Sequence, residues 1–267
     1  MRLAFREQGE GPTALLLHGY PNSSYLWRDV LPAVAGAGHR AVAPDLLGFG
    51  DSDLDGRAGT WEDQVEALEA FVTEHDLAPL ALIVHDWGGL IGLRWACEHP
   101  DAVSALVLMS TGFFPDGKWH GMAKAMRSGD LDEAMETMTR EGFGGLMQQA
   151  EPNAGEDAVD EYFKAFATPE RARAGLALYK SGDFEKLAPY EGRLAALDVP
   201  TLLLWGAKDD YAPIGGAHRF KKEIPHAEMV VLEDAGHFLM EDEPERVAGE
   251  VARFLRSTGL GTPPATM

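Results

Sequence analysis

The sequence predicts an α/β fold with a mostly parallel central sheet, helices on both faces and a helical cap inserted into it. Short apolar runs alternate with segments of helical periodicity, which is the pattern of parallel strands joined by helices. The alternation stops between about residues 113 and 192, where the pattern is helical and no run is typical of a strand. A chain of 267 residues fits one domain with such an insertion, or two small domains.

We therefore expect a core formed by residues 1–112 and 193–267, and a helical cap formed by residues 113–192. The cap should cover the C-terminal edge of the sheet, where open α/β sheets bind their ligands. The cap is rich in methionine. Most of these side chains are expected to pack between helices and some to line a pocket; they are Met122, Met126, Met135, Met138 and Met147.

The individual elements follow from local patterns. The expected strands share a continuous apolar run or a weak alternation, and they cover residues 13–17, 39–44, 80–84, 104–109, 200–205 and 228–232. The expected helices have an apolar face, and they cover residues 26–37, 60–75, 88–99 and 244–256. Pro32 marks a boundary or kink in the first helix, and Thr60 with Asp63 forms a capping box at the start of the second. The tail from Thr258 to Met267 is expected to fray.

Composition excludes several classes of protein. The net charge of −20, from 43 acidic and 23 basic residues, argues against binding to nucleic acid or to anionic membranes and favours a solvated acidic surface. The single cysteine, Cys97, is expected to be a small buried apolar residue. The N-terminus lacks the apolar region of a signal peptide, and no apolar run reaches about 18 residues. We expect a cytoplasmic monomer or homodimer that needs no metal or cofactor.

The stretch from Leu80 to Gly92 organises the chain. A buried apolar run ends in Asp86, Trp87 and two glycines, and a helical pattern follows, so the sequence predicts a buried strand that leads into a helix. An ionised aspartate at this junction can attack an electrophilic carbon and form an ester. The alternative is that Asp86 is only the N-cap of the helix.

Other reactive side chains also follow strands, so parallel strands should bring them to the same edge as Asp86. Asp209 follows the strand at 200–205, and His237 follows the last strand. We expect His237 to take a proton from the water that hydrolyses the ester, and Asp209 to orient the imidazole. Asp210 is the rival to Asp209. Asp209 is preferred because it stands four residues before Pro213, which is the usual spacing of this loop in the proteins that the chain resembles, described below. For His237, the alternative is a capping or core histidine.

The first strand ends in His18-Gly19-Tyr20-Pro21. The backbone N–H groups of Tyr20 and Trp87 are expected to form an oxyanion hole for the tetrahedral intermediate. His18 is expected to bond the backbone of its loop, and His85 to pack.

Over essentially its whole length the chain resembles the α/β-hydrolase superfamily, whose nucleophile elbow is written G-x-S-x-G and whose triad has the order nucleophile, acid, base. Here Asp86 stands at the serine position and Val84 replaces the first glycine, while Gly88 keeps the second. An aspartate at this position resembles haloalkane dehalogenases and epoxide hydrolases. The segments 84–94 and 22–28 are most similar to the dehalogenases.

The resemblance to dehalogenases implies a halide site that includes the indole N–H of Trp87 and a second donor. One class of these enzymes has Asn where this chain has Tyr20; another uses a tryptophan of the cap, for which Trp119 is the candidate. Trp119 could equally be a packing residue of the cap. Fluoroacetate dehalogenases have a similar elbow, but they carry Arg where this chain has Trp87.

The resemblance to epoxide hydrolases has its own support. Their H-G-x-P motif commonly has an aromatic residue, as Tyr20 is here, and they use cap tyrosines to protonate the departing alkoxide. Tyr179 and, more loosely, Tyr162 are the candidates, although both could be packing residues. We expect a small apolar electrophile and water as reactants, with haloalkane dehalogenation first and epoxide hydrolysis as the alternative. Another ester or C–X hydrolase, or a ligand-binding relative without turnover, remains open.

Overall fold

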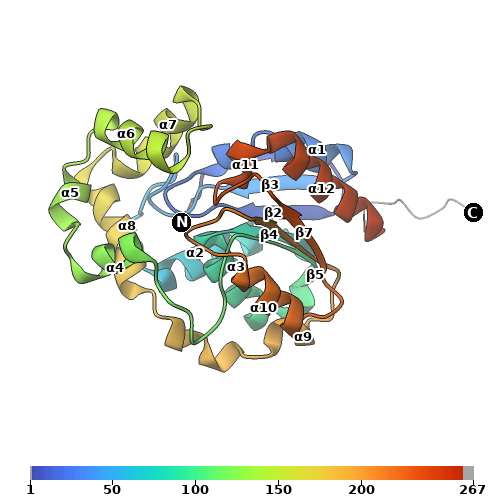
Figure 1. Cartoon of the computed structure of the whole chain (residues 1–267). Helices are drawn as coiled ribbons and strands as arrows, with labels where there is room; N and C mark the ends of the chain where they lie inside the picture. The colour runs from blue at the N-terminus through green and yellow to red at the C-terminus, as the bar shows by residue number, and fades with distance from the viewer. Residues whose placement is uncertain (1, 261–267) are drawn as a thin grey trace, which may run out of the picture.

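A computed structural model describes residues 2–260 of the chain. Within them the strands form one seven-stranded sheet in the order β1-β3-β2-β4-β5-β6-β7 (Figure 1). The strands are β1 (Phe5–Gln8), β2 (Thr13–Leu17), β3 (Arg40–Pro44), β4 (Leu80–His85), β5 (Val103–Met109), β6 (Thr201–Gly206) and β7 (Glu228–Leu232). All neighbouring strands from β3 to β7 run parallel, and β1 pairs antiparallel with β3.

The fold class predicted from the sequence is confirmed. Strands β2, β4 and β6 are buried along their whole length, because helices cover both faces of the sheet. One face carries α1 (Val30–Gly36), α11 (Leu239–Asp242) and α12 (Pro244–Ser257), and the other carries α2 (Trp61–Glu74), α3 (Trp87–Glu98) and α10 (Gly215–Glu223), as Figure 1 shows. The parallel arrangement brings the C-terminal ends of β2, β4, β6 and β7 to one edge.

Several elements differ from the prediction. The edge strand β1 was not expected, since its residues are all exposed and its sequence, Phe-Arg-Glu-Gln, lacks an apolar alternation. The segment 26–37 is not one helix: a 3-10 turn (Ser24–Trp27) precedes α1. Pro32 lies in the first turn of α1, where a backbone N–H has no intrahelical partner and its loss costs little. Helices α10 and α11 were also not predicted.

Other local predictions are confirmed. Thr60 caps α2, its side chain accepts from the backbone N–H of Asp63, and the Asp63 carboxylate accepts from the N–H of Thr60. Cys97 is buried in α3. Of the tail predicted to fray, residues 261–267 lie outside the described residues. Within the described part, no helix is both long and apolar enough to span a bilayer.

Between β5 and β6, all the regular secondary structure is helical. It contains α4 (Gly121–Ser128), α5 (Asp132–Glu136), α6 (Arg140–Ala150), α7 (Glu156–Phe163), α8 (Pro169–Ser181) and α9 (Arg193–Ala196), with 3-10 turns at Lys164–Phe166 and Phe184–Tyr190. Helix α8 contacts α4 and α5 within this segment and α2 of the core. In Figure 1, α4 to α8 lie together at one end of the sheet.

Candidate active site

Asp86 lies in the sharp turn between β4 and α3, with backbone angles φ 50° and ψ −123°. Few residues other than glycine adopt a positive φ, and such strain is concentrated at functional sites. The residue occupies the N-cap position of α3, but its side chain makes no capping hydrogen bond. The absence of this bond disfavours the interpretation of Asp86 as a simple helix cap.

Two glycines make this turn possible because the chain approaches itself closely there. A Cβ atom at Gly19 would lie 2.2 Å from Oδ1 of Asp86, and one at Gly88 would lie 2.3 Å from the carbonyl oxygen of Leu17. Any side chain at either position would collide with the carboxylate or with the neighbouring strand. Glycine is therefore required at positions 19 and 88 if the chain is to hold Asp86 in this position.

The Asp86 carboxylate is held by backbone donors. The N–H of Tyr20 donates to Oδ1 at 2.8 Å, and the N–H of Trp87 also bonds to the carboxylate. On the backbone side, the hydroxyl of Thr111 donates to the carbonyl oxygen of Asp86 at 2.7 Å. The two N–H groups named from the sequence as an oxyanion hole thus both lie at the Asp86 carboxylate, and their role in stabilising an oxyanion stays a prediction.

His237 connects Asp86 to a second carboxylate. Its Nε2 lies 3.6 Å from Oδ2 of Asp86, and its Nδ1 lies 2.9 Å from Oδ2 of Asp209. Asp209 Oδ1 also accepts the backbone N–H groups of Tyr211 and Ala212, each at 2.8 Å. Asp210, the rival partner considered from the sequence, is exposed.

The three charges set one another's protonation state. Burial acts to raise the pKa of Asp86, but the positively charged imidazole of His237, 3.6 Å away, outweighs it and lowers the pKa to about 2. Burial acts to lower the pKa of His237, but Asp209 and Asp86 outweigh it and raise the pKa to about 10. In the resting site, an imidazolium therefore lies between two carboxylates at neutral pH.

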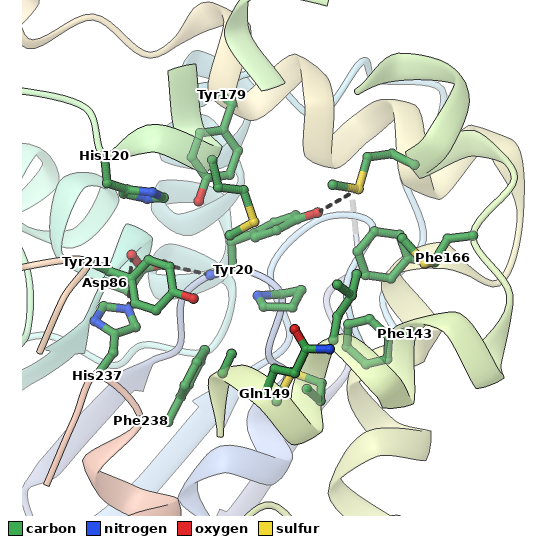
Figure 2. A pocket seen from close by; sticks show the side chains of 17 residues that line it. Tyr20, Asp86, His120, Phe143, Gln149, Phe166, Tyr179, Tyr211, His237 and Phe238 are labelled. Carbon is green, nitrogen blue, oxygen red and sulfur yellow. Dashed lines mark hydrogen bonds and ion pairs between the residues drawn. The ribbon is translucent and has the colours of Figure 1, made fainter. Parts of the chain in front are cut away.

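A cavity of about 280 Å³ opens beside Asp86 and His237 (Figure 2). Its walls are mostly apolar and come largely from the inserted helices; they include Met122, Met135, Met138, Phe143, Leu146, Met147 and Phe166. Most of the methionines expected to pack between helices thus line the cavity instead, while Met126 is fully buried. A second cavity of about 240 Å³ lies on the side of Trp87 and Trp119. The two cavities share Asp86, His120, Tyr179 and Tyr211.

Three of the predicted substrate-binding residues meet. The rings of Trp87 and Trp119 stack, with centroids 5.5 Å apart and planes inclined by 25°. The ring of Tyr179 contacts both. Burial and the Asp86 carboxylate raise the pKa of Tyr179 well above its ordinary value, against a hydrogen bond from the Trp87 side chain. The Tyr179 hydroxyl is therefore neutral and close to the indole N–H of Trp87.

The fourth predicted residue, Tyr162, lies elsewhere. Its hydroxyl donates to Oε1 of Glu241 at 2.5 Å, and the carboxylate of Glu241 also binds the guanidinium of Arg28. Tyr162 is fully buried and lines neither of the two cavities described above. The suggestion that Tyr162 binds substrate is therefore corrected: this tyrosine joins the inserted helices to the core.

The remaining histidines near the turn have structural partners. His18 lies 2.8 Å from the carbonyl oxygen of Gly19 and accepts the backbone N–H of Leu46 at 3.0 Å. Nε2 of His85 lies 2.9 Å from the carbonyl oxygen of His237, so His85 supports the loop that carries the imidazole. Sequence reasoning missed His120 and Tyr211, which lie beside Asp86 in both cavities. The only available signal for His120 was its position before the amphipathic run of α4.

Comparison with known proteins identifies the class. A family described as alpha/beta hydrolase fold matches residues 12–244, and the chain belongs to it, on the branch similar to haloalkane dehalogenases. A haloalkane dehalogenase of Bradyrhizobium diazoefficiens is 29% identical over 95% of this chain and 90% of the relative. The crystal structure of an ancestral haloalkane dehalogenase superimposes with a TM-score of 0.81 at 26% identity, covering 96% of each chain.

The branch also contains other chemistry. A protein of Shewanella oneidensis named cis-3-alkyl-4-alkyloxetan-2-one decarboxylase is 26% identical over 96% of this chain and 86% of its own length. The chain is therefore an enzyme of the α/β-hydrolase family that resembles dehalogenases, and the branch alone does not define its substrate.

Proposed function

We propose that the protein is a haloalkane dehalogenase in which Asp86 displaces halide from a saturated carbon and water then releases the alcohol. The observation that carries this proposal is the arrangement around the Asp86 carboxylate. Oδ1 is occupied by the N–H of Tyr20, which leaves Oδ2 as the oxygen that attacks. As Oδ2 bonds to carbon, the carbon–halogen bond breaks and the halide departs with the bonding electrons.

The second step follows from the charges. Alkylation removes the negative charge of Asp86, which is one of the two causes that raise the pKa of His237. The imidazolium then releases its proton to solvent more readily, and neutral His237 accepts a proton from water as that water attacks the ester carbonyl. When the tetrahedral intermediate collapses, the acyl–oxygen bond between Cγ and Oδ2 breaks, and His237 returns the proton to the departing alkoxide, which leaves as the alcohol. The oxyanion forms at Oδ1, between the N–H groups of Tyr20 and Trp87. Asp209 keeps the imidazole oriented throughout.

The apolar cavity supports a small apolar substrate. Methionine and phenylalanine side chains make up much of the lining and offer an alkyl chain no hydrogen-bonding partner, although Gln149 also lines the cavity. The relatives named as haloalkane dehalogenases support the same reaction.

Epoxide hydrolysis is the alternative, and one observation favours it. Tyr179 is buried, and it lies close enough to Asp86 for the carboxylate charge to raise its pKa. A phenol can protonate the alkoxide that forms when an epoxide ring opens. Tyr211 is a further phenol in both cavities.

One panel of substrates separates these reactions. Purified protein is incubated with 1-chloro-, 1-bromo- and 1-iodoalkanes, with styrene oxide, and with a cis-disubstituted β-lactone, and halide, diol and carbon dioxide are measured. We expect halide release that disappears in Asp86→Ala. Diol formation without halide release from any haloalkane would replace the proposal by the alternative, and carbon dioxide from the lactone alone would reject both.

A further inference from the structure

The leaving group in the proposed reaction needs more than one hydrogen-bond donor, because a halide ion in an apolar cavity loses its hydration shell. The indole of Trp87 is one candidate. The side chain of Tyr20 is not the other, since its hydroxyl points to Sδ of Met135 at 3.9 Å. Trp87 and Trp119 both line the second cavity, and the ring of Trp119 packs against those of Trp87 and Phe184. His120 differs from both, because it lines the two cavities where they meet.

His120, the next residue, has a fixed orientation. It is the N-cap of α4, and its Nδ1 accepts the backbone N–H of Ala123 at 3.3 Å. A nitrogen that accepts a hydrogen bond carries no proton, so in the neutral ring the proton is on Nε2. The side of the ring packs edge-on against Tyr211, with centroids 5.1 Å apart. Capping and packing together hold the imidazole in one tautomer and one orientation.

The protonated nitrogen has no partner of its own. Within residues 2–260, Nε2 of His120 forms no hydrogen bond with another protein group, whereas the other histidines described beside the turn are bonded to backbone atoms. His120 is half-buried and lines both cavities where they meet at Asp86. Figure 2 shows the imidazoles of His120 and His237 on opposite sides of the Asp86 carboxylate in that view.

The ring also stays neutral. Burial lowers the pKa of His120, and the positive charge of His237 acts in the same direction, against the Asp86 and Asp209 carboxylates. Protonation would in addition convert Nδ1 from an acceptor into a donor and break the cap of α4. A neutral imidazole at His120 takes no part in the proton transfer from water to His237. Its N–H can still donate a hydrogen bond to an anion.

We propose that His120 Nε2–H is a hydrogen-bond donor to the halide that leaves the carbon attacked by Asp86, acting together with the indole N–H of Trp87. The inference rests on the proposed dehalogenase function. No proton is transferred: the halide takes the electron pair of the broken bond, and His120 stabilises the resulting negative charge. The donor thus contributes most as the bond breaks, when charge develops on the halogen.

The test uses His120→Asn, because asparagine is a favoured N-cap and keeps the acceptor that α4 needs while its shorter side chain withdraws the donor. His120→Ser repeats the experiment with another capping residue. The control is His226→Asn, which makes the same replacement at an exposed histidine that bonds the carbonyl oxygen of Val199. Thermal unfolding establishes that all variants are folded.

Two measurements are made. Bromide is titrated while the quenching of tryptophan fluorescence is followed, which requires no turnover. Pre-steady-state alkylation of Asp86 is then timed with 1-chloro-, 1-bromo- and 1-iodoalkanes of one chain length. We expect His120→Asn to weaken bromide binding about 10- to 100-fold, as for a hydrogen bond to a charged group. Alkylation should slow most for the chloride and least for the iodide, since chloride concentrates its charge most.

The outcomes are distinct. Halide release by the wild type together with unchanged bromide affinity in His120→Asn and His120→Ser would overturn the inference and leave the proposed function standing. Equal slowing for all three halogens would also overturn it, because a merely structural role has no reason to depend on the leaving group. A wild type that neither binds bromide nor releases halide rejects the inference and the proposed function together.

Discussion

Nε2 of His237 lies 3.6 Å from Oδ2 of Asp86, which is longer than an ordinary hydrogen bond. The same imidazole bonds Asp209 at 2.9 Å through Nδ1. His237 is thus firmly held on the side of Asp209 and only loosely on the side of Asp86. In the proposed mechanism, Nε2 is the nitrogen that faces Asp86 and accepts a proton from the water that attacks the side-chain ester.

Replacing Asp86 by Asn should abolish turnover, since the neutral amide is a poor nucleophile of nearly the same shape. The expected loss exceeds about 10⁴-fold in kcat. The melting temperature at neutral pH should fall slightly, because the lowered pKa of Asp86 means that its ionised form is favoured in the folded protein. Initial rates and thermal unfolding are measured on the same samples. Activity near that of the wild type would falsify the assignment of Asp86 as nucleophile.

Replacing His237 by Gln should stop the reaction after the first step. Alkylation requires only Asp86 and the leaving-group donors, whereas hydrolysis of the ester requires a base. Intact-mass measurement after addition of a haloalkane should therefore show one added alkyl group per chain, and peptide mapping should locate it on Asp86. An unmodified mass with a substrate that the wild type converts would contradict the two-step mechanism.

Asp209 and Asp210 offer a matched pair of variants. Asp209→Asn removes the acceptor that orients His237 and should lower kcat by about 10³- to 10⁴-fold, by analogy with the acid of other triads. Asp210→Asn removes an exposed carboxylate next to it and should leave kcat within about twofold. Similar losses in both variants would show that the loop, rather than the Asp209 carboxylate, is responsible.

The two chemical steps should differ in their dependence on pH. The pKa of Asp86 is about 2, so the carboxylate stays ionised and alkylation should be independent of pH from about 5 to 9. The pKa of His237 is about 10 in the resting site and falls once Asp86 is esterified or replaced by Asn. Ester hydrolysis should therefore accelerate as pH rises through that lowered pKa.

Rapid-quench measurements at several pH values separate the two steps, and an NMR titration of His237 in the wild type and in Asp86→Asn gives the pKa values directly. A pKa of His237 that is equal in both proteins would contradict the electrostatic coupling, as would an ester hydrolysis rate that falls with rising pH.

The sequence predicted those parts of the molecule that depend on local pattern. Asp86, Asp209 and His237 each follow an apolar strand, and parallel strands must end at one edge, so their meeting could be inferred before any coordinates. The capping box at Thr60 was visible for the same reason, because it depends on two residues three positions apart.

What the sequence did not predict depends on contacts between distant segments. Tyr162 was expected at the substrate, but its partner Glu241 lies 79 residues further along the chain. The role proposed for His120 depends on which ring nitrogen caps α4, a detail that no spacing reveals. Strand β1 is held by pairing with β3 and not by its own polar residues, so no local signal marks it.

The contact between Tyr162 and Glu241 has a consequence for directed evolution. Glu241 has no exposed side-chain surface and accepts hydrogen bonds from both the phenol of Tyr162 and the guanidinium of Arg28. A change at Glu241 leaves the guanidinium of Arg28 without its partner, and a change at Tyr162 removes one hydrogen bond from a buried carboxylate. Mutant libraries that aim to alter substrate range should therefore randomise Met122, Met138 and Leu146 and keep this pair constant. Diversity at the apolar wall changes which substrates fit, whereas diversity at the pair is expected to destabilise the fold.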